Sequence, residues 1–233
     1  MTGIKVRNIK SIFDPLTLEC DAWYDGEGRL IFLNELEAFK PLLSLLPHPW
    51  LEIDMGSGRF AQALGIESGT DPSIGNVKLA RQRDIVAFLG QGHDKIFEDS
   101  AFGTIFLIAT PRFLPFTLKI FREARRILRP GGKLVTGFVP REGPWGYHLL
   151  QQKLEGHLLY KYATFYCYQE VERLISNSGF HIEKVISTLF QKPGDAHTIE
   201  DPREGIFAEA GFEVIEAEKT KEGLVNNRTL ENK

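Results

Sequence analysis

Residues 50–60 read Trp50-Leu51-Glu52-Ile53-Asp54-Met55-Gly56-Ser57-Gly58-Arg59-Phe60. A short apolar run ends in acidic residues, and a glycine turn and a sequence that favours a helix follow it. This order is typical of the strand–turn–helix units that bind nucleotide-containing ligands. Gly56 and Gly58 lack the Cβ atoms that would hold a ligand away from the backbone. The stretch therefore predicts a ligand site in an α/β protein.

Strand and helix patterns alternate on both sides of this stretch. After the strand that begins at Trp50, the expected strands are 66–70, 85–89, 104–109, 133–139, 180–190 and 212–217. The expected helices are 28–46, 59–64, 76–83, 116–128 and 169–178. This alternation implies right-handed crossovers and a doubly wound, mostly parallel sheet with helices on both faces. We expect the continuous apolar run 85–89 to be buried on both faces.

The composition is that of an ordinary globular protein. The 233 residues are 42% hydrophobic and carry a net charge of −3, which gives no long-range field to attract nucleic acid. Cys20 and Cys167 stand far apart without companions at metal-ligand spacing, so neither a disulfide framework nor a metal site is expected. No apolar run approaches the roughly 20 residues of a membrane span. We expect a cytoplasmic protein that binds neither nucleic acid nor membrane, of unknown oligomeric state.

One cluster of basic residues leaves an alternative open. A solvated helix face is favoured over a nucleic-acid surface, because the chain as a whole is acidic and cations are favourable near the C-terminal end of a helix. The cluster consists of Arg122, Arg125, Arg126 and Arg129.

Aromatic residues concentrate in two segments outside the alternating pattern. Residues 140–168 resemble an inserted cover over a ligand site, and Trp145, Tyr147 and His148 lie in it as candidate substrate contacts. Tyr147 and His148 are also the candidates for a proton acceptor, with packing or surface roles as the alternative. Trp23 and Tyr24 are expected either to cover the pocket or to pack in the core.

Three acidic residues decide between two classes of ligand. Glu52 and Asp54 stand directly before the glycines, where carboxylates oppose a pyrophosphate and suit an ammonium group. Asp71 ends the next predicted strand, where its two oxygens can accept hydrogen bonds from the hydroxyls of a ribose. Solvated loop positions or helix caps are the alternative for each acid alone. Their combined placement favours a ligand with an amino acid head group.

Four motifs together resemble one enzyme family. They are Glu52-Ile-Asp-Met-Gly-Ser-Gly-Arg-Phe60, Thr70-Asp-Pro-Ser73, Ile127-Leu-Arg-Pro-Gly-Gly-Lys-Leu134 and Ser178-Gly-Phe180. In this order and spacing they resemble the class I S-adenosylmethionine-dependent methyltransferases of the small-molecule type. The resemblance covers about residues 20–217 and is closest to bacterial methyltransferases of unassigned substrate.

The resemblance implies a fold and a set of cofactor contacts. The fold is a seven-stranded Rossmann-like sheet with an antiparallel last strand. The cofactor is S-adenosylmethionine, which becomes S-adenosylhomocysteine. Its expected contacts are Glu52, Asp54, Met55, Gly56, Ser57, Gly58, Asp71, Pro72, Gln91, Gly92, Ala109 and Thr110, with Trp23 and Tyr24 as a cover. Gln91 departs from many relatives, which carry a carboxylate at this position.

The sequence thus predicts one methyltransferase domain over residues 1–233. Its parts are a cap helix region (20–49), a cofactor-binding core (50–139), the aromatic insert (140–168), a C-terminal helix and final strands (169–217) and a charged tail (218–233). The expected reaction is in-line transfer of a methyl group to a nitrogen or oxygen of a small molecule. A nicotinamide-dependent oxidoreductase and a non-catalytic cofactor-binding module are the alternatives.

Overall fold

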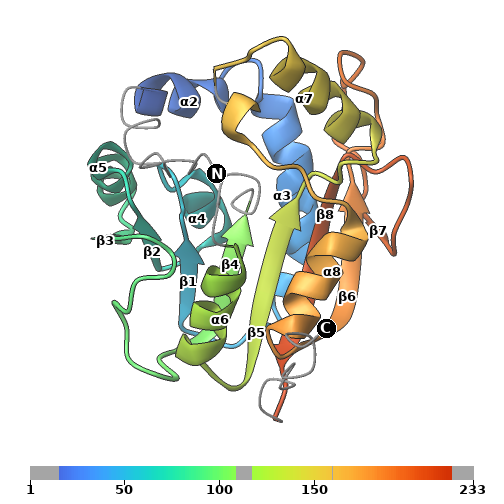
Figure 1. Cartoon of the computed structure of the whole chain (residues 1–233). Helices are drawn as coiled ribbons and strands as arrows, with labels where there is room; N and C mark the ends of the chain where they lie inside the picture. Colours follow the sequence, from blue (N-terminus) through green and yellow to red (C-terminus); the bar gives the residue numbers. More distant parts are fainter. Residues whose placement is uncertain (1–15, 109–116, 159, 222–233) are drawn as a thin grey trace, which may run out of the picture.

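The computed structural model of the chain describes residues 16–108, 117–158 and 160–221. Within them, eight strands form one sheet in the order β3-β2-β1-β4-β5-β8-β6-β7 (Figure 1). The strands are β1 (Trp50–Ile53), β2 (Ser68–Asp71), β3 (Val86–Leu89), β4 (Phe102–Ile108), β5 (Leu128–Phe138), β6 (Phe180–Thr188), β7 (Arg203–Glu204) and β8 (Phe212–Lys219).

Helices cover both faces of the sheet. They are α2 (Thr17–Trp23), α3 (Arg29–Leu43), α4 (Arg59–Leu64), α5 (Ile74–Gln82), α6 (Thr117–Ile127), α7 (Pro144–Leu154) and α8 (Tyr168–Asn177), with a 3₁₀ turn η3 at Tyr160–Tyr162. Helices α3, α4 and α5 share one apolar core with the sheet, and α6 and α8 share another. None of the helices in the described ranges is long and apolar enough to cross a membrane.

The alternation of side chains along each strand explains these two cores. Side chains of a strand alternate between the faces of a sheet, so an apolar strand supplies both layers. In β4, Phe106 belongs to the core under α3, whereas Ile105 and Leu107 belong to the core under α6 and α8. All seven residues of β4 are buried. The predicted doubly wound architecture is confirmed.

Strand pairing confirms the mixed character of the sheet. Strands β3, β2, β1, β4 and β5 pair in parallel, and β8 runs antiparallel to both β5 and β6. The expectation of seven strands is wrong by one. The additional strand, β7, lies in the polar segment between the predicted strands 180–190 and 212–217, and it pairs with β6 through Ile186↔Glu204 and Ser187↔Arg203.

The expected burial of the strand at 85–89 is also wrong. Strand β3 forms the edge of the sheet and packs on α5, and its Val86 and Leu89 side chains are 58% and 47% exposed. A run of apolar residues indicates a strand, but it does not reveal whether the strand lies at an edge. Val86 and Leu89 therefore face solvent at the end of the sheet.

The basic cluster of α6 contacts groups of the protein itself. Arg125 donates to the carbonyl oxygens of Gly179 and Thr220, at 3.2 and 3.1 Å. Arg126 forms ion pairs with Glu123 and Asp99. Arg129, in β5, donates to the carbonyl oxygen of His48 at 3.2 Å. These contacts give three of the four arginines a structural role.

The parallel strands place their carboxyl ends at one rim of the sheet. Helices α2 and α7 lie across this rim, above the points of β1, β4 and β5 (Figure 1). In parallel α/β sheets, ligands bind beyond this rim. The glycine turn after β1 and Asp71 at the end of β2 both lie there.

Candidate active site

The turn after β1 is shaped by residues with left-handed backbone conformations. Asp54, Gly56 and Gly58 have φ angles of 54°, 59° and 82°. A Cβ atom at Gly56 would meet no atom within 4 Å, so this residue opens into free space. At Gly58 a Cβ atom would lie 2.5 Å from Ile85 Cδ1. The space beside the backbone is thus free at Gly56, whereas the absence of a side chain at Gly58 is required for packing.

Met55 anchors the turn on the neighbouring strand. Its backbone N–H donates to the carbonyl oxygen of Thr70 at 2.9 Å, and its side chain is buried against Gly69. A Cβ atom at Gly69 would lie only 2.2 Å from Met55 Sδ. The missing side chain in β2 thus provides the space for the thioether.

Asp71 links the turn to the end of β2. Its Oδ2 accepts a hydrogen bond from the Gly56 backbone N–H at 2.9 Å. Its Oδ1 accepts from the Ser73 backbone N–H at 2.8 Å and from Asn76 Nδ2 at 3.0 Å. Because both carboxylate oxygens are engaged, Asp71 fixes the turn and the start of α5 together.

Glu52 and Asp54 place buried carboxyl groups beneath the turn. Glu52 Oε2 and both oxygens of Asp54 have no hydrogen-bond partner within the described ranges. Burial raises the pKa of both groups well above the usual range, and the Asp71 carboxylate raises them further. The backbone N–H of Ala61 opposes the rise at Glu52. The backbone N–H of Gly92 opposes the rise in the pKa of Asp54, although it does not reach hydrogen-bond geometry.

These groups line a cavity of about 1000 Å³ between the rim of the sheet and helices α2 and α7. Glu52, Asp54 and Asp71 lie on its wall, together with Met55, Gly56, Ser57 and Pro72. Ile108, the last residue of β4, also lies on the wall. Cavities that hold small molecules commonly measure about 300–1000 Å³.

Helix α7 forms part of the cover with one of its faces. Trp145, His148, Leu149 and Gln152 line the cavity at helical spacing. Trp145 is buried, and its Nε1 donates to the Gln191 carbonyl oxygen at 2.7 Å. Tyr147 lies on the outer face of the helix, is 63% exposed and does not line the cavity. The structure therefore contradicts the prediction that Tyr147 is a site residue.

The other predicted contacts fall into three groups. Trp23 and Tyr24 of the α2 region line the cavity, as the covering role requires. Gln91 and Gly92 do not line it: Gln91 is exposed, and Gly92 is buried against Ile53 and Asp54. Their predicted contact with adenine is thus not reproduced by the geometry. Ala109 and Thr110 lie outside the described residues.

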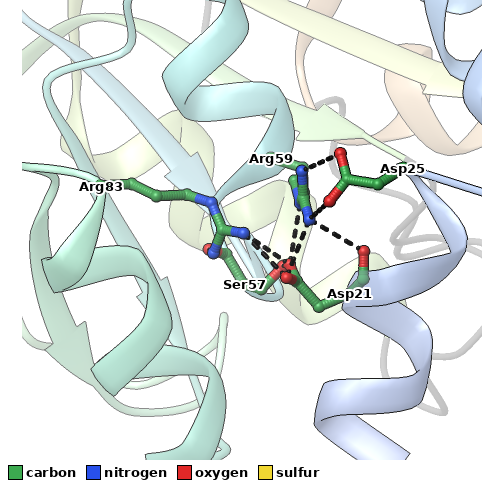
Figure 2. Close-up of polar contacts among 5 residues, drawn as sticks. All are labelled: Asp21, Asp25, Ser57, Arg59 and Arg83. Carbon is green, nitrogen blue, oxygen red and sulfur yellow. Dashed lines mark hydrogen bonds and ion pairs between the residues drawn. The ribbon is translucent and has the colours of Figure 1, made fainter.

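A group of charged residues beside the glycine turn is absent from the sequence-based prediction. Asp21 of α2 accepts hydrogen bonds from Ser57, Arg59 and Arg83, and Arg59 also pairs with Asp25 (Figure 2). Two further wall residues, Glu35 of α3 and Asn76 of α5, are also new. Asp21 is 36 and 62 residues from Ser57 and Arg83, so no local pattern could have revealed the group.

The fold of the chain closely matches that of a known structure. A structure from Thermotoga maritima, described as an S-adenosylmethionine-dependent methyltransferase and possible histamine N-methyltransferase, is 33% identical. It superimposes with a TM-score of 0.84 over 91% of this chain and 100% of that one. The chain belongs to the S-adenosylmethionine-dependent methyltransferases. This membership identifies it as an enzyme of the S-adenosylmethionine-dependent class and is at odds with the nicotinamide alternative.

Sequence relatives of this methyltransferase match most of the chain. The methyltransferase domain family matches residues 51–136, from β1 into β5. An uncharacterized protein of Mycobacterium tuberculosis is 40% identical over 84% of this chain and 70% of its own length. An uncharacterized protein of Methanocaldococcus jannaschii is 32% identical over 90% of this chain and 99% of its own.

The wall of the cavity fits the cofactor of the family, S-adenosylmethionine. Buried carboxyl oxygens without partners are costly when ionised, and a cationic ammonium group relieves that cost. Glu52 Oε2 and the Asp54 oxygens are such groups on the wall. The open space at Gly56 admits a ligand close to the backbone.

We expect cofactor binding to release protons. Glu52 and Asp54 have raised pKa values in the free protein, so they hold protons above the usual carboxyl range of about 4. An ammonium group favours the ionised forms and lowers these pKa values, so the affinity should rise with pH across this window. Calorimetry with S-adenosylhomocysteine in buffers of different ionisation enthalpy measures the protons released.

The Glu52→Gln variant should release fewer protons than the wild-type protein. Glu98→Gln, at an exposed position away from the cavity, is the matched control and should leave the release unchanged. Binding by the wild-type protein without proton release at any pH would contradict the assignment of these carboxyls to the ammonium group.

Proposed function

We propose that this methyltransferase transfers the methyl group to a nitrogen or oxygen atom of a small molecule. The observation that carries the proposal is that one cavity joins the glycine turn to the apolar and aromatic face of α7. Trp145, Leu149 and Leu189 line the part of the wall away from the turn. A cavity of about 1000 Å³ suits a cofactor with a small acceptor beside it.

The cofactor contacts follow from the residues on the wall. Glu52 and Asp54 face the ammonium group of the amino acid part, and Asp71 receives the ribose hydroxyls. Trp23, Tyr24 and Pro72 flank the cofactor, and by the family resemblance Ala109 and Thr110 lie near the sulfonium. Asp71 also holds Gly56, so it serves both the ligand and the shape of the turn.

S-Adenosylmethionine supplies the methyl group as an electrophilic carbon on a sulfonium. The residues of this chain align the acceptor with that carbon and keep water out of the cavity. Trp145 is suited to positioning because its ring is buried and its Nε1 is held by the Gln191 carbonyl oxygen. No obligatory acid or base is needed for the displacement itself.

The charge of the wall favours an acceptor that carries an amine. Seven carboxyl groups line the cavity: Glu19, Glu27, Glu35, Glu52, Asp54, Asp71 and Glu155. Arg59 is the one Lys or Arg of the wall within the described ranges, and Asp21 and Asp25 neutralise it. The relative described as a possible histamine N-methyltransferase also supports this class. Glu35, buried on α3, is suited to contact the amine.

An amine that binds as an ammonium ion must lose a proton before its nitrogen can attack the methyl carbon, and His148 is the candidate to accept that proton. Its imidazole lies on the cavity wall with the side-chain amide of Gln152 at 3.1 Å from Nε2. Because Gln152 lies one turn further along α7, it can hold the orientation of the ring. His148 is thus proposed as the proton acceptor.

Turnover of a panel of acceptors tests the function. We expect amines to be methylated in preference to phenols and carboxylates, measured as S-adenosylhomocysteine formed. Glu35→Gln should raise KM for the amine by about tenfold through loss of one charge-assisted contact. Glu37→Gln on the same helix, where Glu37 pairs with Lys40, is the control and should act as wild type. Normal cofactor binding without turnover of any compound would contradict the proposal.

The Asp71→Asn variant tests the cofactor assignment. An amide cannot replace two anionic oxygens that accept from several donors, so the affinity for S-adenosylhomocysteine should fall about 10- to 100-fold. Calorimetry measures the affinity, and circular dichroism checks that the variant is folded. A folded variant that binds as tightly as the wild-type protein would remove Asp71 from the site.

The His148→Gln variant tests the proton acceptor. Loss of a general base typically lowers the rate about 10²- to 10⁴-fold, so kcat for an amine should fall by this order while cofactor affinity stays the same. His181→Gln, at an exposed position of β6 away from the cavity, should leave kcat unchanged. An unchanged kcat for His148→Gln would leave His148 as a wall residue only.

A further inference from the structure

Asp21 lies at the centre of a charged cluster that joins three elements of the fold. It is on α2, Ser57 and Arg59 are at the start of α4, and Arg83 is at the end of α5 (Figure 2). Asp21 Oδ1 accepts from Ser57 Oγ at 2.5 Å and from Arg59 Nε at 2.9 Å. Arg83 Nη2 donates to both oxygens of Asp21, at 2.9 and 2.8 Å.

The cluster is balanced in charge and largely shielded from water. The guanidinium of Arg59 also pairs with Asp25, so two arginines face two aspartates. The side chains of Asp21, Arg59 and Arg83 are 14%, 16% and 14% exposed. Burial opposes the ionisation of Asp21, but hydrogen bonds from Arg59, Ser57 and Arg83 outweigh it and lower its pKa to about 2. Asp21 is therefore ionised throughout the ordinary pH range.

Helix α2 has little apolar burial of its own. Thr17 is its one buried residue, and its Leu18 side chain is 73% exposed. Beyond the charged cluster, aromatic packing holds the segment that follows: Tyr24 meets Phe32 and Phe60 edge to face. Elements with few buried apolar contacts open at low free-energy cost.

The same helix closes the cofactor side of the cavity. Thr17, Cys20, Trp23 and Tyr24 line it from above, and Gly56 and Ser57 line it from below. A ligand that enters from this side must pass between α2 and the glycine turn. The charged contacts of Asp21 join these two walls to each other.

We propose that α2 is a movable cover of the cofactor site and that Asp21 is the positioning residue that holds it closed on the glycine turn. In the closed form Asp21 accepts hydrogen bonds from Ser57, Arg59 and Arg83, which fixes the turn and the aromatic residues around the bound cofactor. Release of these contacts opens the cover for exchange of S-adenosylhomocysteine. In the short turn between α2 and α3, Gly28 is buried under the Trp23 ring, whereas Gly26 is exposed and is the position proposed as the joint.

Two matched variants, Asp21→Asn and Asp25→Asn, test this role. Asp25 is 63% exposed and contacts only the outer side of Arg59, so its loss should change little. Asp21→Asn should speed dissociation of S-adenosylhomocysteine about 10- to 100-fold, measured by stopped flow. Hydrogen exchange should show lost protection of residues 17–23 with the protection of β4 and β5 unchanged.

Two outcomes would overturn the proposal. One is a wild-type dissociation rate and wild-type protection of α2 in Asp21→Asn. The other is loss of protection spread evenly over the sheet, which would make Asp21 a residue of general stability. If Asp21→Asn does not fold, Arg83→Gln weakens the cluster from α5 and should give the same local result. Both measurements use S-adenosylhomocysteine alone, so their outcome does not depend on the identity of the methyl acceptor.

Discussion

The hydrogen bond from the Gly56 backbone N–H to the carboxylate of Asp71 is the contact on which the site depends. It joins the turn after β1 to the end of β2, two strands that the parallel sheet already places side by side. Because Ser73 and Asn76 hold the other oxygen, the carboxylate cannot turn away. The path of the backbone between Asp54 and Gly58 is thereby fixed before any ligand binds.

This fixed turn sets the electrostatic character of the cavity. Glu52 Oε2 and both oxygens of Asp54 lie beneath it without a hydrogen-bond partner in the part of the chain that the structure describes, and Asp71 stands beside them. Arg59 at the start of α4 would offset this charge, but Asp21 and Asp25 occupy its guanidinium on the side of α2. The cavity therefore stays acidic although Arg59 lies on its wall. The positively charged groups of the cofactor meet little electrostatic repulsion from this arginine.

Most of the fold could be predicted from the sequence because the patterns that indicate helices and strands are local. The helical and strand periods around residues 50–60 predicted a doubly wound sheet, and the family resemblance implied its antiparallel last strand; both are observed. Strand β7 was missed because two residues in a polar segment carry no period, and only their pairing with β6 defines them. The exposure of β3 was missed because strand order is a tertiary property.

The residues of the candidate site likewise divide into those that local sequence reveals and those that only the folded chain brings together. The acids and glycines that follow a strand were found from the sequence, and they lie near one another on the rim. Tyr147 was selected from an insert in which no helix was predicted, so the face on which each residue of α7 lies was unknown. Gly58 was assigned to a ligand although it accommodates Ile85, which is 27 residues away in the sequence. The cluster around Asp21 likewise joins residues that only the folded chain brings together.

The contact between Met55 and Gly69 has a consequence for the evolution of this sequence. The thioether occupies the volume that any side chain at position 69 would need, since a Cβ atom there would lie 2.2 Å from the sulfur. An alanine at position 69 thus requires the Met55 thioether to move aside or a smaller residue to replace it. The two positions, one in the cofactor turn and one in the strand beside it, are therefore coupled in the substitutions that they accept.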